Sequence, residues 1–147
     1  GTGITLVDGG AGNSVFNSVN PNIRDRLFTF FAPQALSTTM NAEEIRIRIP
    51  FNMEGIRCDL AVTNTPLVSG ITCDLIQFGE PDSSGTTMFT TSANKPMLWA
   101  NSSRGATTTF DDKTLYSGSW LGIRILQVGS ATAQGSNLTL TLVARAS

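Results

Sequence analysis

The sequence of 147 residues contains no histidine. Histidine is the usual general base, it activates the nucleophile in Ser-His-Asp and Cys-His sites, and it is the commonest side-chain ligand of metal ions. Without it, most hydrolytic and metal-dependent active sites are hard to build. The composition therefore predicts a protein that is not an enzyme and that holds no cofactor and no metal.

Charge is also scarce. Asp, Glu, Lys and Arg make up 14% of the residues, against roughly 25% in typical soluble domains. Ten basic and eleven acidic side chains leave a net charge of -1, so no overall field attracts nucleic-acid phosphates or anionic lipids. No apolar run reaches the length of about 18 residues that a membrane-spanning helix needs. We expect neither nucleic acid nor a membrane among the partners.

Only two cysteines are present, Cys58 and Cys73. Each lies in an alternating apolar run, which favours two buried free thiols over a disulfide. If the two runs form a hairpin about residues 66 and 67, the sulfur atoms lie diagonal to each other and are poorly placed for a bond.

Helical periodicity is missing, because no stretch of ten residues combines it with capping residues at both ends. Apolar and polar residues alternate instead, as in strands with one buried face. The clearest runs are 45–49, 56–62, 71–75, 121–125 and 138–142, separated by turns rich in Gly, Pro, Asn and Ser. Seven to nine short strands at regular spacing predict a single antiparallel β-sandwich, jelly-roll-like.

The chain divides into two parts in this prediction: an extended N-terminal arm at residues 1–39 and a sandwich domain at residues 40–147. Three phenylalanines, Phe28, Phe30 and Phe31, concentrate near the end of the arm. They could cap the core of their own domain, or they could anchor the arm on a neighbouring subunit. For an oligomer we predict the anchor role, with Arg46 and Arg48 on the outward face of the next strand as further intersubunit contacts.

Three other chemistries stay open as alternatives. Trp99, Tyr116 and Trp120 could stack on sugar rings in a carbohydrate-binding module, although packing in the core or an interface is the preferred interpretation. Asp59 and Asp74 could flank a cleft in a polysaccharide-cleaving enzyme, but we expect them to pair with arginine. The loop carboxylates could hold Ca²⁺, but solvated turns are preferred; these residues are Glu80 with Asp82, and Asp111 with Asp112.

A series of ordered motifs spans residues 36–144. An Ile-rich strand ends in a Pro-aromatic step at Pro50-Phe51, and two strands follow on either side of a Thr/Pro/Ser-Gly turn. The last motif is the most specific: a strand ending in Gln127-Val128-Gly129-Ser130, followed by the Leu/Thr alternation of residues 138–142. With these motifs the chain resembles a β-sandwich module of tailed-bacteriophage virion structural proteins. The loops at residues 80–85 and 99–105 are longer than in that pattern.

The resemblance implies a non-enzymatic virion structural protein that packs as an oligomeric capsid-decorating or tail/fibre-associated module. Its partners would be copies of itself, most commonly in a trimer, and other virion proteins. It implies a location at the phage particle surface or tail, and no catalytic residues. The alternative function is a carbohydrate-binding β-sandwich that recognises host-surface glycans.

Overall fold

The computed structural model describes residues 25–39, 45–80 and 83–147. These residues form ten strands and one 3-10 turn, so the predicted all-β class is confirmed. The strands are β1 (Asp25–Ala35), β2 (Ile47–Arg48), β3 (Met53–Ala61), β4 (Ile71–Phe78), β5 (Thr86–Thr87), β6 (Met97–Leu98), β7 (Arg104–Thr107), β8 (Thr114–Leu115), β9 (Trp120–Gln127) and β10 (Ser136–Ala146); the 3-10 turn is η3 (Ser92–Asn94).

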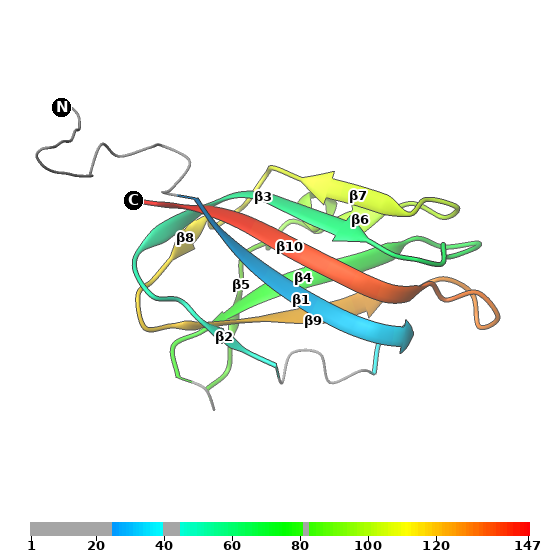
Figure 1. Cartoon of the computed structure of the whole chain (residues 1–147), viewed down its shortest axis with the longest axis horizontal. Coiled ribbons are helices and arrows are strands. Elements are labelled where there is room, and N and C mark those ends of the chain that lie inside the picture. The colour runs from blue at the N-terminus through cyan, green and yellow to red at the C-terminus, as the bar shows by residue number, and fades with distance from the viewer. Residues whose placement is uncertain (1–24, 40–44, 81–82) are drawn as a thin grey trace, which may run out of the picture.

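Two antiparallel sheets pack face to face (Figure 1). Sheet A has the order β1-β10-β3-β7 with β8 also on β3, and sheet B has the order β2-β9-β4-β5 with β6 also on β4. The pairs are nested: β1 with β10, β2 with β9, β3 with β8 and β4 with β5. A long antiparallel ribbon rolled up on itself pairs its strands in this way, which makes the sandwich a jelly roll as predicted.

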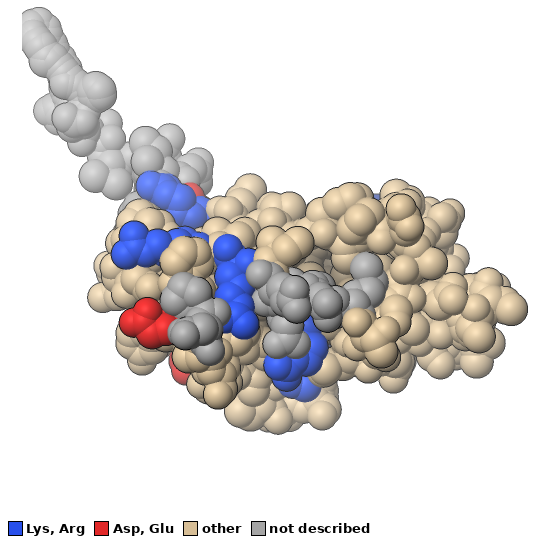
Figure 2. All heavy atoms as spheres, turned by 90° about the horizontal axis from the view of Figure 1, so that it is seen from below, with Lys and Arg blue, Asp and Glu red and all other residues tan. Residues whose placement is uncertain are grey.

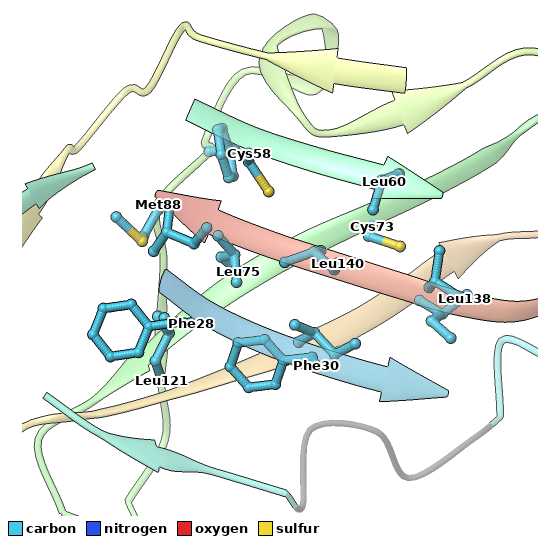
Figure 3. Packing of buried hydrophobic residues seen from close by; sticks show 14 of the residues in the cluster. Phe28, Phe30, Cys58, Leu60, Cys73, Leu75, Met88, Leu121, Leu138 and Leu140 are labelled. Carbon is cyan, nitrogen blue, oxygen red and sulfur yellow. The ribbon is translucent and has the colours of Figure 1, made fainter. Parts of the chain in front are cut away.

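The core lies between the two sheets and is built from alternate residues of the long strands. In Figure 3 the rings of Phe28 and Phe30 enter it from β1, which lies beside β10 with its Leu138 and Leu140. Phe28 is 5% exposed and Phe30 is 4% exposed. The register places Phe30 opposite Leu140, so both strands present apolar side chains at the same level. The inner faces of the two sheets therefore close on one continuous apolar layer.

The predicted boundary between arm and sandwich needs a correction at residues 25–39. β1 pairs with β10 from Asp25 opposite Arg145 to Ala35 opposite Ser136, with one irregularity after Ala32. This segment is therefore a full strand of sheet A, while residues 1–24 of the predicted arm lie outside the described residues. Phe28 and Phe30 are buried in their own domain and are not anchors on a neighbour, because strand alternation turns both rings inward.

A β-bulge changes the face assigned to one residue of β3. Arg57 lies opposite Val143 and Gly55 lies opposite Ala144, so Ile56 has no partner on β10. An extra residue reverses the alternation on one side of the bulge. Ile56 is consequently 36% exposed, although the sequence pattern placed it inward with Cys58.

The hairpin considered between the runs at residues 56–62 and 71–75 does not form. β3 pairs with β10 in sheet A, whereas β4 pairs with β9 in sheet B, so residues 62–70 cross from one sheet to the other. The two cysteines are free and buried, as predicted. Figure 3 shows both sulfur atoms between the sheets. Burial raises the pKa of both thiols, that of Cys73 to about 12, and the charge of Asp74 adds to the effect at Cys73.

Candidate functional site

The three aromatic residues considered for sugar stacking lie at two ends of the sandwich. Trp99 follows β6, which pairs with the start of β4, whereas Trp120 pairs with Phe78 at the end of β4. Tyr116 belongs to the same turn as Trp120, because the Ser119 N–H donates to its carbonyl oxygen at 3.1 Å. The structure therefore brings Tyr116 and Trp120 together and leaves Trp99 at the opposite end, so the three rings form no single platform.

The outer face of sheet A has an apolar half along β1 and β10. Leu27 lies opposite Val143, Thr29 opposite Thr141, and Phe31 opposite Thr139. Leu27 is 67% exposed and Phe31 is 57% exposed. Within the described residues, β1 is also an edge strand of sheet A. We call these outward residues of β1 and β10, from position 27 to 31 and from 139 to 143, the apolar half of sheet A.

The other half of the same face, along β3 and β7, is charged. The Arg57 guanidinium binds the Asp59 carboxylate at 2.7 Å, and both side chains are partly exposed. Next to this ion pair an open cavity of about 520 Å³ lies over the two paired strands, lined by Arg57, Asp59, Leu60, Ala61, Arg104, Gly105 and Ala106. The outer face of sheet A thus combines an apolar surface and a hollowed, charged surface side by side.

Arg46 and Arg48, the predicted intersubunit arginines, differ in their surroundings. The Arg46 guanidinium stacks over the ring of Phe78, with its carbon 3.5 Å from the ring centroid. This cation–π contact ties Arg46 to its own domain. Arg48 is exposed on β2. Figure 2, which views the molecule from the side of β2, shows basic side chains gathered on this face among mainly uncharged surface.

Asp74 and Lys95 form a buried ion pair on sheet B. Asp74 is 4% exposed, and one of its oxygens accepts from the Lys95 ammonium at 3.1 Å. The other oxygen accepts from the Thr87 hydroxyl at 2.5 Å, and the ammonium also donates to the Phe89 carbonyl oxygen. Every strong acceptor of the carboxylate is thereby satisfied, so the group holds β4, β5 and the segment before β6 together.

Asp59 and Asp74 do not flank a common cleft, as the catalytic alternative requires. Asp59 lies on β3 of sheet A, and Asp74 lies on β4 of sheet B. They were expected on adjacent strands, but the core separates the two sheets. Arg57 pairs with Asp59 as expected, whereas the partner of Asp74 is Lys95, which the alternation pattern gave no means to identify because it lies outside a long strand.

The loop carboxylates have ordinary structural partners. Asp111 accepts hydrogen bonds from the N–H and hydroxyl of Thr91 and from the Asn94 amide, and these bonds lower the pKa of its carboxyl. Asp112 accepts from the Thr114 N–H. Within the described ranges, no three His, Cys, Asp or Glu side chains gather into a possible metal site. Asp82, the partner suggested for Glu80, lies outside those ranges.

The end of the sandwich that carries Trp99 is formed by three connections, which we call the loop end: residues 62–70, 99–103 and 128–135 (Figure 1). They are joined by main-chain hydrogen bonds. The Asn101 N–H donates to the Pro66 oxygen at 2.8 Å, and the Leu67 N–H donates to the Ala133 oxygen at 3.0 Å. The loop end is therefore one connected structure, which the sequence could not show because its three parts are distant along the chain.

No helix in the described part of the chain is long and apolar enough to cross a membrane. Comparisons of the chain with protein-family models, with curated proteins and with solved structures found no match.

Proposed function

We propose that this chain is a non-enzymatic structural module of a tailed-bacteriophage virion, and that it assembles as a homo-oligomer through the apolar half of sheet A. The observation that carries the assembly role is the exposure of Leu27 and Phe31 on a long edge strand. The virion location depends on the resemblance of residues 36–144 alone.

The edge strand itself favours a covered surface. β1 is 11 residues long and apolar, and in the described residues it pairs on one side only. Proteins that stay monomeric usually shorten such edges or protect them with charge, because an open strand with apolar side chains associates readily. Asp25 and Arg26 supply charge at the beginning of β1, and Pro33 with the irregularity after Ala32 interrupts its end. The six residues from Leu27 to Ala32 have neither kind of protection.

The energetics of the contact are favourable. Removing a Leu or Phe side chain from water contributes about 1.5–3 kcal/mol, so Leu27 and Phe31 would add several kcal/mol at each interface. Stable interfaces bury about 800 Å² per partner. An interface of that size would include Val143 and the outward threonines of β1 and β10 as well as the two large apolar residues. The charged half of the face, with its Arg57–Asp59 pair, suits the polar rim of such an interface.

A non-catalytic role is supported by where the acidic side chains lie. Among the described residues, the carboxylates considered for hydrolysis or metal binding are paired with a cation, as Asp59 and Asp74 are, or hydrogen-bonded within loops, as Asp111 is. An assembly module needs none of them in a cleft.

The mass of the protein in solution tests the proposal. We expect sedimentation equilibrium to show about three times 15.6 kDa for the unchanged chain and one copy for the double variant Leu27→Arg/Phe31→Arg. The control is Leu126→Arg, which places one arginine on an exposed leucine of sheet B and should leave the oligomer intact. Circular dichroism should show all three proteins folded.

A monomer of the unchanged chain at about 100 µM would refute assembly through this surface. The same conclusion would follow if the control variant dissociated the oligomer as completely as the double variant did.

A further inference from the structure

The loop end has three properties that assembly through sheet A does not explain: it has no charge, it exposes large apolar side chains, and it concentrates unusual backbone conformations. We propose that it is a binding site for a neutral oligosaccharide. The proposal concerns a surface separate from the apolar half of sheet A, so it goes beyond the assembly role.

Charge is missing from all three connections. Residues 62–70, 99–103 and 128–135 include no Lys, Arg, Asp or Glu. The loops at the opposite end differ, because residues 79–80 and 108–113 include Glu80, Asp111, Asp112 and Lys113. An anionic ligand such as a phosphate or an acidic sugar would find no cation within these three connections. Arg104 follows the second connection, but it lines the cavity beside the Arg57–Asp59 pair on sheet A. A ligand that binds the three connections is therefore expected to be uncharged.

Trp99 provides the surface on which a sugar can stack. Its side chain is 73% exposed, and the neighbouring connection exposes Leu67 at 44% and Val68 at 85%. A large aromatic ring that faces water is unusual, since burial of such a ring is strongly favourable. The ring offers a flat apolar surface of the kind that packs against the C–H face of a pyranose.

The backbone under the ring is held in place. A Cβ at Gly70 would collide with the Leu98 carbonyl oxygen and lie 3.1 Å from the Cα of Trp99, so glycine allows the two connections to touch. The hydrogen bond from the Asn101 N–H to the Pro66 oxygen closes the same contact. A ring on a preorganised backbone loses less conformational freedom on binding than one on a loose loop.

Backbone strain is concentrated at this end. Gln34, Val68, Asn101 and Asn137 are the non-glycine residues with positive φ in the described ranges, and all four lie in the loop end or at the strand ends beside it. Asparagine tolerates this region, but the φ of +73° at Val68 is exceptional for a β-branched residue. Residues held in such conformations cluster at binding and active sites, which makes this end of the sandwich a candidate site.

A neutral cavity supplies the hydrogen-bonding groups. It measures about 270 Å³ and opens between the first and third connections, lined by Ala35, Asn64, Thr65, Thr132, Ala133, Gln134, Gly135 and Ser136. Amides and hydroxyls both donate and accept, which matches the hydroxyl groups of a sugar. Residues 66–68 separate this cavity from Trp99, so a chain of several sugars could contact both sides.

Other ligand classes fit less well. A surface that binds a membrane usually has several basic side chains beside its exposed apolar ones. The three connections, which expose Trp99, Leu67 and Val68, include no basic residue. An apolar peptide would need a continuous apolar groove, whereas five of the eight residues that line the cavity have uncharged polar side chains. The combination of an aromatic ring with uncharged polar groups is the one that an uncharged sugar requires.

The experiment uses an array of defined oligosaccharides that includes neutral hexose, deoxyhexose and N-acetylhexosamine chains together with sialylated and uronic-acid chains. The full chain, Trp99→Ala and Tyr116→Ala are compared. Tyr116 is the matched control because it is an exposed aromatic at the opposite end. Affinities for the best neutral chain are then measured by calorimetry, and the mass of each variant is measured by sedimentation.

We expect the full chain to bind neutral chains, Trp99→Ala to weaken that binding at least about tenfold, and Tyr116→Ala to leave it within about twofold. Trp99→Ala should keep the oligomeric state, so failure of the assembly proposal can be distinguished from failure of this one. The proposal is overturned if no neutral chain binds, if only acidic chains bind, if Trp99→Ala binds normally, or if Trp99→Ala changes the mass.

Discussion

Replacement of Phe30 by alanine separates a core role from an interface role in β1. Phe30 is 4% exposed and lies between the sheets opposite Leu140. Removing a buried phenylalanine costs about 3–5 kcal/mol, and β1 is an edge strand that can move inward to fill part of the space. We therefore expect a loss of about 3 kcal/mol, a large part of the roughly 5–15 kcal/mol that holds a domain folded.

Urea denaturation, followed by tryptophan fluorescence, measures this loss. With a slope of about 1.5 kcal/mol per M, the midpoint for Phe30→Ala should fall by roughly 2 M. The series should be repeated at several protein concentrations, because dissociation of an oligomer also contributes to apparent stability. Extrapolation to low concentration gives the value for the single domain.

The matched variant is Phe31→Ala, one residue away and 57% exposed. Its effect on the single domain should stay within about 0.5 kcal/mol, while the oligomer should dissociate at higher protein concentration than the unchanged chain does. If Phe30→Ala loses less than about 1 kcal/mol and weakens the oligomer instead, the assignment of the two rings is reversed and our account of β1 is wrong.

Three further outcomes follow from buried groups and close contacts. Lys95→Met leaves the Asp74 carboxylate buried without its cation and should cost about 3–5 kcal/mol in urea denaturation. The contribution of the buried, neutral Cys73 thiol to the free energy of unfolding should be fully present below pH 9, the ordinary pKa of a thiol. It should fall by about 1.4 kcal/mol per pH unit as the pH rises toward the raised pKa of Cys73, and thermal unfolding of Cys73→Ala should lack this part of the pH dependence. Gly105→Ala places a Cβ against a main-chain carbonyl and should cost about 1–3 kcal/mol by chemical denaturation, whereas Gly79→Ala meets no atom and should be nearly neutral.

Alternation identifies strands and faces well in this chain. Leu138, Leu140 and Leu142 are all fully buried, and so are Cys73 and Leu75 on the opposite sheet. Period-2 patterns report which side of a strand is apolar, and burial of one face then follows. The same rule places Phe28 and Phe30 inward once their segment is recognised as a strand, which its glycine- and asparagine-rich lead obscured.

Partners and local irregularities are not encoded in alternation. The turn residues around Pro66 suggested a hairpin, but turn chemistry does not specify whether the next strand joins the same sheet or the facing one. One inserted residue at Ile56 changes the face by a bulge, and nothing in the pattern of β3 alone marks it, because the irregularity exists only relative to β10. The loop end was missed for the same reason, since Trp99 gains its significance from connections far away in sequence.

The nested pairing of strands also sets the order in which the chain can fold. Asp25 at the beginning of β1 binds Arg145 at the end of β10, 120 residues later. Among the described residues β1 pairs with β10 alone. During synthesis this pairing cannot form until the last strand has left the ribosome, and the apolar side chains of β1 stay exposed to water until then. Folds dominated by such distant pairings form slowly, and in the meantime they expose apolar surfaces that are prone to aggregation. Expression at lower temperature or with chaperones should therefore raise the soluble yield of this protein.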